Sequence, residues 1–124
     1  MLKRQKVVAV VDDDPSILRA TRDLLGAHGL ATEVFASAEE FLDREAATHV
    51  DCVLLDIHLG GMSGIELRRQ LTASNCTLPV IFMTALDDEL THREARAAGC
   101  IAVLRKPYSA RQLMDAIEKA SPSA

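Results

Sequence analysis

Aromatic residues are scarce in this chain of 124 residues, at 3% of the sequence, and tryptophan is absent. The core must therefore be aliphatic, since apolar residues still make up 48% of the chain. Cysteine is also rare: Cys52, Cys76 and Cys100 are odd in number and show no CxxC spacing. This pattern argues against a disulfide framework or a zinc site and indicates free thiols in a reducing compartment.

Positive charge and long hydrophobic runs are limited as well. The net charge is −4, and short basic clusters such as Arg68-Arg69 lack interleaved aromatics, which argues against direct binding of nucleic acid. No segment approaches the ~20 apolar residues of a membrane-spanning helix. We therefore expect a cytoplasmic protein with one domain over residues 1–124, a short tail at 121–124 and no output domain after the last helix.

Strand-like and helix-like patterns alternate from end to end. Apolar runs typical of strands occupy five segments: Lys6–Val11, Ala31–Phe35, Cys52–Leu55, Pro79–Met83 and Ile101–Leu104. Short connections between alternating strands and helices imply right-handed crossovers. The sequence therefore predicts a doubly wound α/β fold, with a five-stranded parallel sheet between two layers of helices.

Helix-start signals follow the strands. Asp14-Pro15 is typical of an N-cap followed by proline at the first helical position. In a capping box, a serine side chain and the side chain three residues later each bind the other residue's backbone N–H group. The sequence predicts three such boxes: Ser37 with Glu40, Ser63 with Glu66, and Ser109 with Gln112.

Polar side chains stand where the strands end. Asp12 and Asp13 follow the first strand, Asp56 the third, Thr84 the fourth and Lys106 the fifth. Because parallel strands bring their carboxyl ends to one edge of the sheet, where ligands bind, we expect these groups to meet. Three carboxylates and one ammonium leave two net negative charges, which requires a raised pKa or a bound cation. For Thr84, a helix N-cap is the alternative interpretation.

A phosphate chemistry fits this set of groups. Several carboxylate oxygens suit a hard divalent cation, and Mg²⁺ binds through one or two carboxylates while keeping several waters. An oxygen of Asp56 would then be free to attack phosphorus, with Thr84 and Lys106 contacting the phosphoryl oxygens. Phosphoryl transfer needs mainly such positioning and charge neutralisation, and a carboxylate nucleophile gives an acyl phosphate. The residues thus predict that Asp56 accepts a phosphoryl group.

These segments resemble the receiver domain of bacterial two-component response regulators. The similarity covers essentially the whole chain and rests on four motifs in order: Val10–Pro15, Leu54–Leu59 with Gly61–Gly64, Phe82–Ala85, and Lys106–Tyr108. The resemblance implies a flavodoxin-like sheet with strand order 2-1-3-4-5 and a cis peptide bond before Pro107.

The resemblance also implies roles for the site residues. Asp56 would be the phosphoacceptor and a metal ligand, Asp13 a direct Mg²⁺ ligand, and Asp12 would act largely through water. The main-chain carbonyl of His58 would be a further ligand. The donor would be a phosphohistidine on a sensor histidine kinase or a histidine phosphotransfer protein.

Thr84 and Lys106 would couple the phosphoryl group to a conformational shift, again by resemblance. The expected output surface comprises the fourth helix, fifth strand and fifth helix, residues Asp87 to Lys119, and would bind an unknown downstream protein or a second copy of the chain. Two departures stand out. Val103 replaces the Tyr or Phe often found there, which weakens an aromatic-switch mechanism, and Gly60 stands where many relatives have proline.

Two alternatives remain open. A hydrolase of small phosphate esters that forms an aspartyl-phosphate usually has a second acid two residues after the nucleophile, where this chain has His58, and usually carries a cap domain. A receiver-like binding module that is never phosphorylated is opposed by the intact set of site residues. The leading interpretation is a phosphorylation-dependent signalling switch that is not an enzyme, apart from catalysing its own phosphorylation and dephosphorylation.

Overall fold

Five parallel strands form one sheet in the order β2-β1-β3-β4-β5, as expected. The computed structural model describes residues 5–44 and 49–122, so that Ser123 and Ala124 of the predicted tail lie outside the described residues. The elements in chain order are β1 Val7–Val11, α1 Pro15–Ala27, β2 Ala31–Phe35, α2 Ala38–Leu42, β3 Cys52–Asp56, α3 Gly64–Ala73, β4 Val80–Thr84, α4 Glu89–Ala98, β5 Ala102–Arg105 and α5 Ala110–Ala120.

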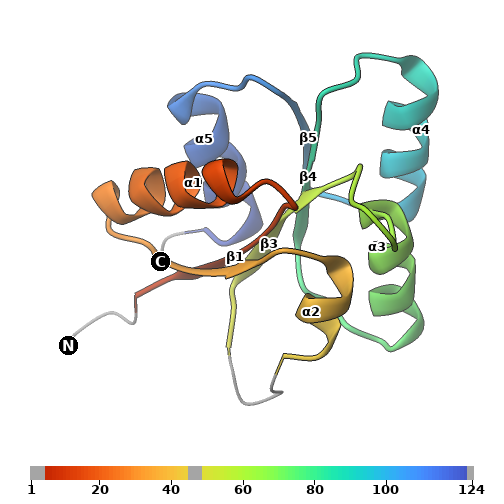
Figure 1. Ribbon diagram of the computed structural model, residues 1–124, viewed down its shortest axis with the longest axis horizontal. Helices are drawn as coiled ribbons and strands as arrows, with labels where there is room; N and C mark the ends of the chain where they lie inside the picture. Colours follow the sequence, from red (N-terminus) through yellow and green to blue (C-terminus); the bar gives the residue numbers. More distant parts are fainter. Residues whose placement is uncertain (1–4, 45–48, 123–124) are drawn as a thin grey trace.

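Helices cover both faces of the sheet, with α1 and α5 on one side and α2, α3 and α4 on the other (Figure 1). The strands feed both layers because successive side chains point to opposite faces. In β1, for example, Ala9 and Val11 belong to the core beneath α2, α3 and α4, whereas Val8 and Val10 belong to the core beneath α1 and α5. The alternation turns an unbroken apolar run into two separate cores.

The sheet is buried at its centre and partly exposed at its edges. Every residue of β3 and β4 is buried, whereas every residue of β2 is half-buried. Thr32 and Glu33 lie in β2, which pairs only with β1 and so forms the predicted edge strand. Among the described residues, no helix is long and apolar enough to cross a bilayer.

The predicted helix starts are confirmed, but two of the three capping boxes are only half formed. Asp14 caps α1 through the N–H group of Ser16. Only the pair at Ser109 is reciprocal among the described residues. Ser63 and Ser37 accept the expected bonds at α3 and α2, but the carboxylate of Glu40 binds the N–H group of Ala36, one residue earlier than predicted. The upstream N–H group offers the carboxylate an alternative partner that the spacing rule does not consider.

The start of α3 lies directly against the end of β3. A Cβ atom added to Gly64 would lie 2.3 Å from the main-chain carbonyl oxygen of Asp56, so no side chain fits there. The N–H group of Gly64 donates to the carbonyl of Ile57 at 3.0 Å. This close approach fixes the backbone on which the Asp56 side chain is mounted.

Two glycine substitutions should therefore have opposite effects on stability. Gly64→Ala should lower the free energy of unfolding by about 1–3 kcal/mol, because backbone atoms must move to make room for the methyl group. Gly26→Ala in α1 meets no atom within 4 Å and should raise the free energy of unfolding by roughly 0.5–1 kcal/mol. Urea denaturation of both variants measures this, and a Gly64→Ala variant as stable as the wild type would contradict the close approach.

Candidate functional site

The predicted acids meet at the carboxyl edge of the sheet. Asp12, Asp13 and Asp56 each place one carboxylate oxygen within 4.8 Å of the others. Asp12 and Asp56 are 1% and 6% exposed, whereas Asp13 is exposed to solvent. The oxygen-only donor set and the crowding of like charges fit a hard divalent cation such as Mg²⁺.

Lys106 follows β5 at the same edge of the sheet and contacts two of these acids. Its Nζ donates to Asp12 Oδ2 at 2.8 Å and to Asp56 Oδ2 at 3.1 Å. The Lys106 N–H group donates to the carbonyl of Thr84 at 2.8 Å, and the peptide bond before Pro107 is cis, as expected. One ammonium thus bridges carboxylates at the ends of two different strands.

The pKa values of this pair reflect burial and mutual attraction. Burial raises the pKa of Asp56, and the hydrogen bond from His58 N–H together with the charge of Lys106 offsets only part of that rise. Burial would lower the pKa of Lys106, but its bonds to Asp12 and Asp56 outweigh burial and raise it. Lys106 therefore stays protonated, while the Asp56 carboxylate is less stable than one in water.

The loop after β3 is held by the same carboxylates. His58 N–H donates to Asp56 Oδ1 at 3.0 Å, and Gly60 N–H donates to Asp13 Oδ2 at 3.3 Å. A proline at position 60 would have no N–H group, so the departure noted in the sequence supplies a contact with the site. The ligand role of the His58 carbonyl stays a prediction.

Thr84 ends β4 at the same edge and is fully buried. Its Oγ1 accepts a hydrogen bond from the N–H group of Leu86 at 3.0 Å. The alternative role as a helix N-cap is wrong, because Asp88 caps α4 through the N–H group of Thr91. A contact between Thr84 and a phosphoryl group stays a prediction.

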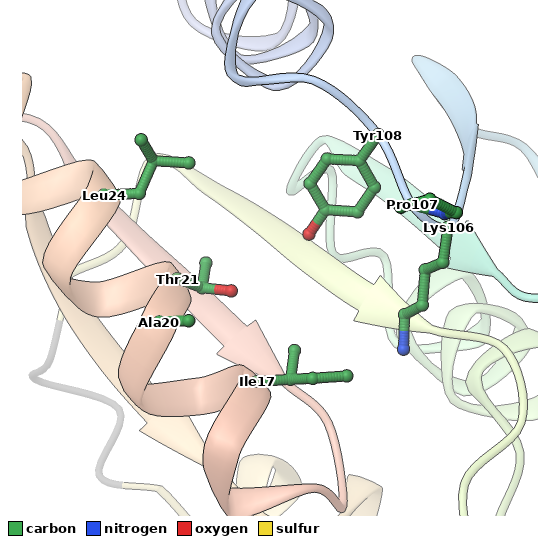
Figure 2. A pocket seen from close by; sticks show the side chains of 7 residues that line it. All are labelled: Ile17, Ala20, Thr21, Leu24, Lys106, Pro107 and Tyr108. Atoms are coloured by element: carbon green, nitrogen blue, oxygen red, sulfur yellow. The ribbon is translucent and has the colours of Figure 1, made fainter.

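An apolar hollow of about 470 Å³ opens beside Lys106. Figure 2 shows it between α1 and the segment after β5, with Tyr108 facing Thr21 across it. The Tyr108 hydroxyl donates to Met83 Sδ at 3.1 Å. Burial raises the pKa of Tyr108, and its hydrogen bond with Thr21 offsets part of the rise. The Tyr108 ring thus contacts β4 through Met83 and lines the same hollow as Lys106.

One contact with the site loop was not predicted. Glu39, in the first turn of α2, accepts a hydrogen bond from the N–H group of Met62 at 3.2 Å. In the sequence Glu39 resembles any acid in the first turn of a helix. Such an acid is favourable near the positive end of the helix dipole, whichever way its side chain is directed. The capping-box spacing gives Glu40 a predicted partner, but no sequence signal gives one to Glu39.

Comparison with known proteins places this geometry in a family. The response regulator receiver domain model matches residues 8–118. The transcriptional regulatory protein TdiR of Thauera aromatica is 34% identical over 91% of this chain and 50% of its own length. The response regulator protein TodT of Pseudomonas putida is 32% identical over 97% of this chain and 53% of its own length. The chain therefore spans about half the length of these relatives.

Solved structures agree over nearly the whole chain. The crystal structure of FixJ-N superposes with a TM-score of 0.89 at 29% identity, covering 98% of each chain. A response regulator receiver protein from Burkholderia phymatum gives a TM-score of 0.85 at 39% identity, covering 97% of this chain and 98% of the other.

The raised pKa of Asp56 predicts a stability effect of defined sign. Because the folded state binds this proton more tightly than the unfolded chain, the ionised carboxylate lowers the free energy of unfolding at neutral pH. Asp56→Asn should therefore raise the free energy of unfolding in metal-free buffer by about 0.5–2 kcal/mol. The gain should shrink as the pH falls through the raised pKa, since the wild-type carboxyl then becomes neutral as well.

Urea denaturation at neutral and at mildly acidic pH measures the difference. Asp115→Asn, at an exposed position of α5, is the matched control and should show no comparable gain. A wild type at least as stable as Asp56→Asn at neutral pH would contradict the desolvation of Asp56.

Proposed function

The chain belongs to the response regulator receiver domain family, and we propose that it acts as a phosphorylation-dependent switch with Asp56 as its phosphoacceptor. Receiver domains are signalling domains of two-component systems. The observation that carries the proposal is the meeting of separate segments in one pocket, where Lys106 binds both Asp12 and Asp56. A surface lysine would not be held by two buried carboxylates.

The proposed step transfers a phosphoryl group from a phosphohistidine of a histidine kinase or phosphotransfer protein. A carboxylate oxygen of Asp56 attacks phosphorus, the P–N bond of the donor breaks, and the electron pair moves to the imidazole nitrogen, which takes a proton. The Lys106 ammonium lies 3.1 Å from Asp56 Oδ2 and so stands where charge on the phosphoryl oxygens needs compensation. Thr84, at the end of the adjacent strand, would contact the phosphoryl group and respond to it.

Asp13 and Asp12 would hold Mg²⁺ together with Asp56 and the main-chain carbonyl of His58. Their oxygens lie close enough to share one ion, and Asp13 is open to solvent, as an exchangeable ion requires. When bound, Mg²⁺ supplies positive charge that offsets both the acid cluster and the incoming phosphate. Each carboxylate oxygen of Asp12 already accepts one hydrogen bond, from Lys106 or from the N–H group of Asp14, which suits a role through water.

The proposed output is a change at the surface formed by α4, β5 and α5. Leu90 and Ile101 are large apolar side chains of this surface that are 61% and 41% exposed. Val103, in the position of the family's aromatic switch, packs against the core beneath α4. Coupling from Thr84 would therefore travel through packing and not through rotation of a ring.

For the partner of that surface, we infer only the class of molecule. Relatives are named transcriptional regulatory proteins, and this chain matches about half of their length. We propose that the 124 residues form one cytoplasmic receiver domain whose output is binding of a downstream protein or of a second copy. Direct contact with nucleic acid is disfavoured by the net charge of −4.

Phosphorylation can be tested with a small acyl-phosphate donor. In the presence of Mg²⁺ the wild type should gain the mass of one phosphate, measured on the intact protein. Asp56→Asn should show no adduct, because the nucleophile is lost, and Asp13→Asn should show much less. Removal of Mg²⁺ with a chelator should prevent adduct formation, since the acid cluster would then repel the donor.

The same assay separates the alternatives. Release of phosphate from a simple ester over many turnovers would support a hydrolase, although His58 occupies the position where a hydrolase needs its second acid. Absence of any adduct in Mg²⁺ would support a module that is never phosphorylated and would overturn the proposal.

Association through the output surface gives a further prediction. If phosphorylation favours a homodimer, Leu90→Ser should weaken association of the phosphorylated form, since it removes the most exposed large apolar side chain of that surface. Leu42→Ser, at a 40% exposed position of α2, is the matched control. Sedimentation velocity measures the dimer, and equal dimerisation of Leu90→Ser and wild type would exclude this surface.

A further inference from the structure

The loop between β3 and α3 is fixed by three backbone N–H groups, each bound to a different carboxylate. His58 donates to Asp56, Gly60 donates to Asp13, and Met62 donates to Glu39. The three donors alternate along the loop, so the acids hold it at every second residue. The loop carries the main-chain carbonyl that is proposed to bind Mg²⁺.

Two of these three acceptors have other tasks in the proposed reaction. A phosphoryl group on Asp56 and a cation on Asp13 would compete with the N–H groups for the same carboxylates. Among the three described contacts, Glu39 is the acceptor that lies outside the acid cluster. Neither a phosphoryl group on Asp56 nor a cation on Asp13 would therefore compete for the carboxylate of Glu39.

The backbone conformation at Gly61 leaves room for the carboxylate of Glu39. Gly61 has φ +79°, a conformation that side chains rarely adopt, and a Cβ atom there would lie 3.0 Å from Glu39 Oε2. Glu39 stands on a helix anchored in the core by Ala38 and Phe41. Met62 packs against the same core, so the carboxylate and its partner both start from fixed positions.

We propose that Glu39 is a positioning residue for the metal and phosphoryl site, acting by holding the loop that presents the His58 carbonyl. The inference rests on the proposed function and adds a residue from a separate helix to it. Groups that orient a metal ligand without touching the metal often determine affinity, because a ligand that is free to move binds less well. The contact is a hydrogen bond that Glu39 accepts, so we expect a neutral acceptor of the same shape to hold the loop as well.

The test compares Mg²⁺ binding in four proteins by isothermal titration calorimetry. Glu39→Ala should raise the Kd for Mg²⁺ on the order of tenfold. Glu39→Gln keeps an acceptor oxygen for Met62 and should bind close to wild type. Glu40→Ala removes an equal charge from the same helix, but Glu40 contacts Ala36 and not the loop, so its Kd should not change. Urea denaturation confirms that each variant is folded.

Two readouts separate positioning from a general loss of structure. Amide exchange of Met62 should speed up in Glu39→Ala and not in Glu40→Ala. The slow phosphorylation of Glu39→Ala by an acyl-phosphate donor should recover at saturating Mg²⁺, because the chemical groups remain in place.

The unfavourable outcomes are distinct. Wild-type affinity in Glu39→Ala, an equal loss in Glu39→Gln, or an equal loss in Glu40→Ala each overturns the inference and leaves the proposed function standing. A wild type that neither binds Mg²⁺ nor forms an adduct overturns both.

Discussion

The bridge from Lys106 to Asp12 and Asp56 is the interaction on which the site depends. Asp12 and Asp56 lie at the same edge of the parallel sheet and are both buried. Two carboxylates with oxygens within 4.8 Å of each other and little water around them repel strongly. One ammonium neutralises half of that charge and leaves the remainder for a second cation. The remaining negative charge is what the proposed binding of Mg²⁺ would neutralise.

The surrounding backbone is arranged so that this unfavourable cluster cannot relax. β3 is buried along its whole length, and Gly64 packs so closely on Asp56 that the strand end cannot shift toward α3. On the other side, Lys106 is tied to β4 through the carbonyl of Thr84. Packing of Gly64 therefore keeps Asp56 in place, and the hydrogen bond to the Thr84 carbonyl keeps Lys106 in place, despite the repulsion between the acids.

Much of this could be predicted from sequence because the signals are local. Asp12, Asp56 and Lys106 each come at or just after the end of an apolar run, and a parallel sheet places these strand ends at one edge. Strand order came from resemblance alone, since periodicity says which residues face a core but not which strand is the neighbour. The Glu39 contact was missed for a different reason: it joins segments 23 residues apart, and nothing in a helix-start acid shows which distant N–H group it will meet.

The position of Tyr108 has a practical consequence. The chain contains one tyrosine, no tryptophan and three phenylalanines. At wavelengths that tyrosine absorbs and phenylalanine does not, its intrinsic emission therefore comes from a single ring, which lines the hollow two residues after Lys106. Any event that moves Lys106 or repacks that hollow changes the surroundings of the only tyrosine or tryptophan fluorophore in the molecule. With tyrosine-selective excitation, the protein thus carries an optical reporter of its own site that needs no attached label.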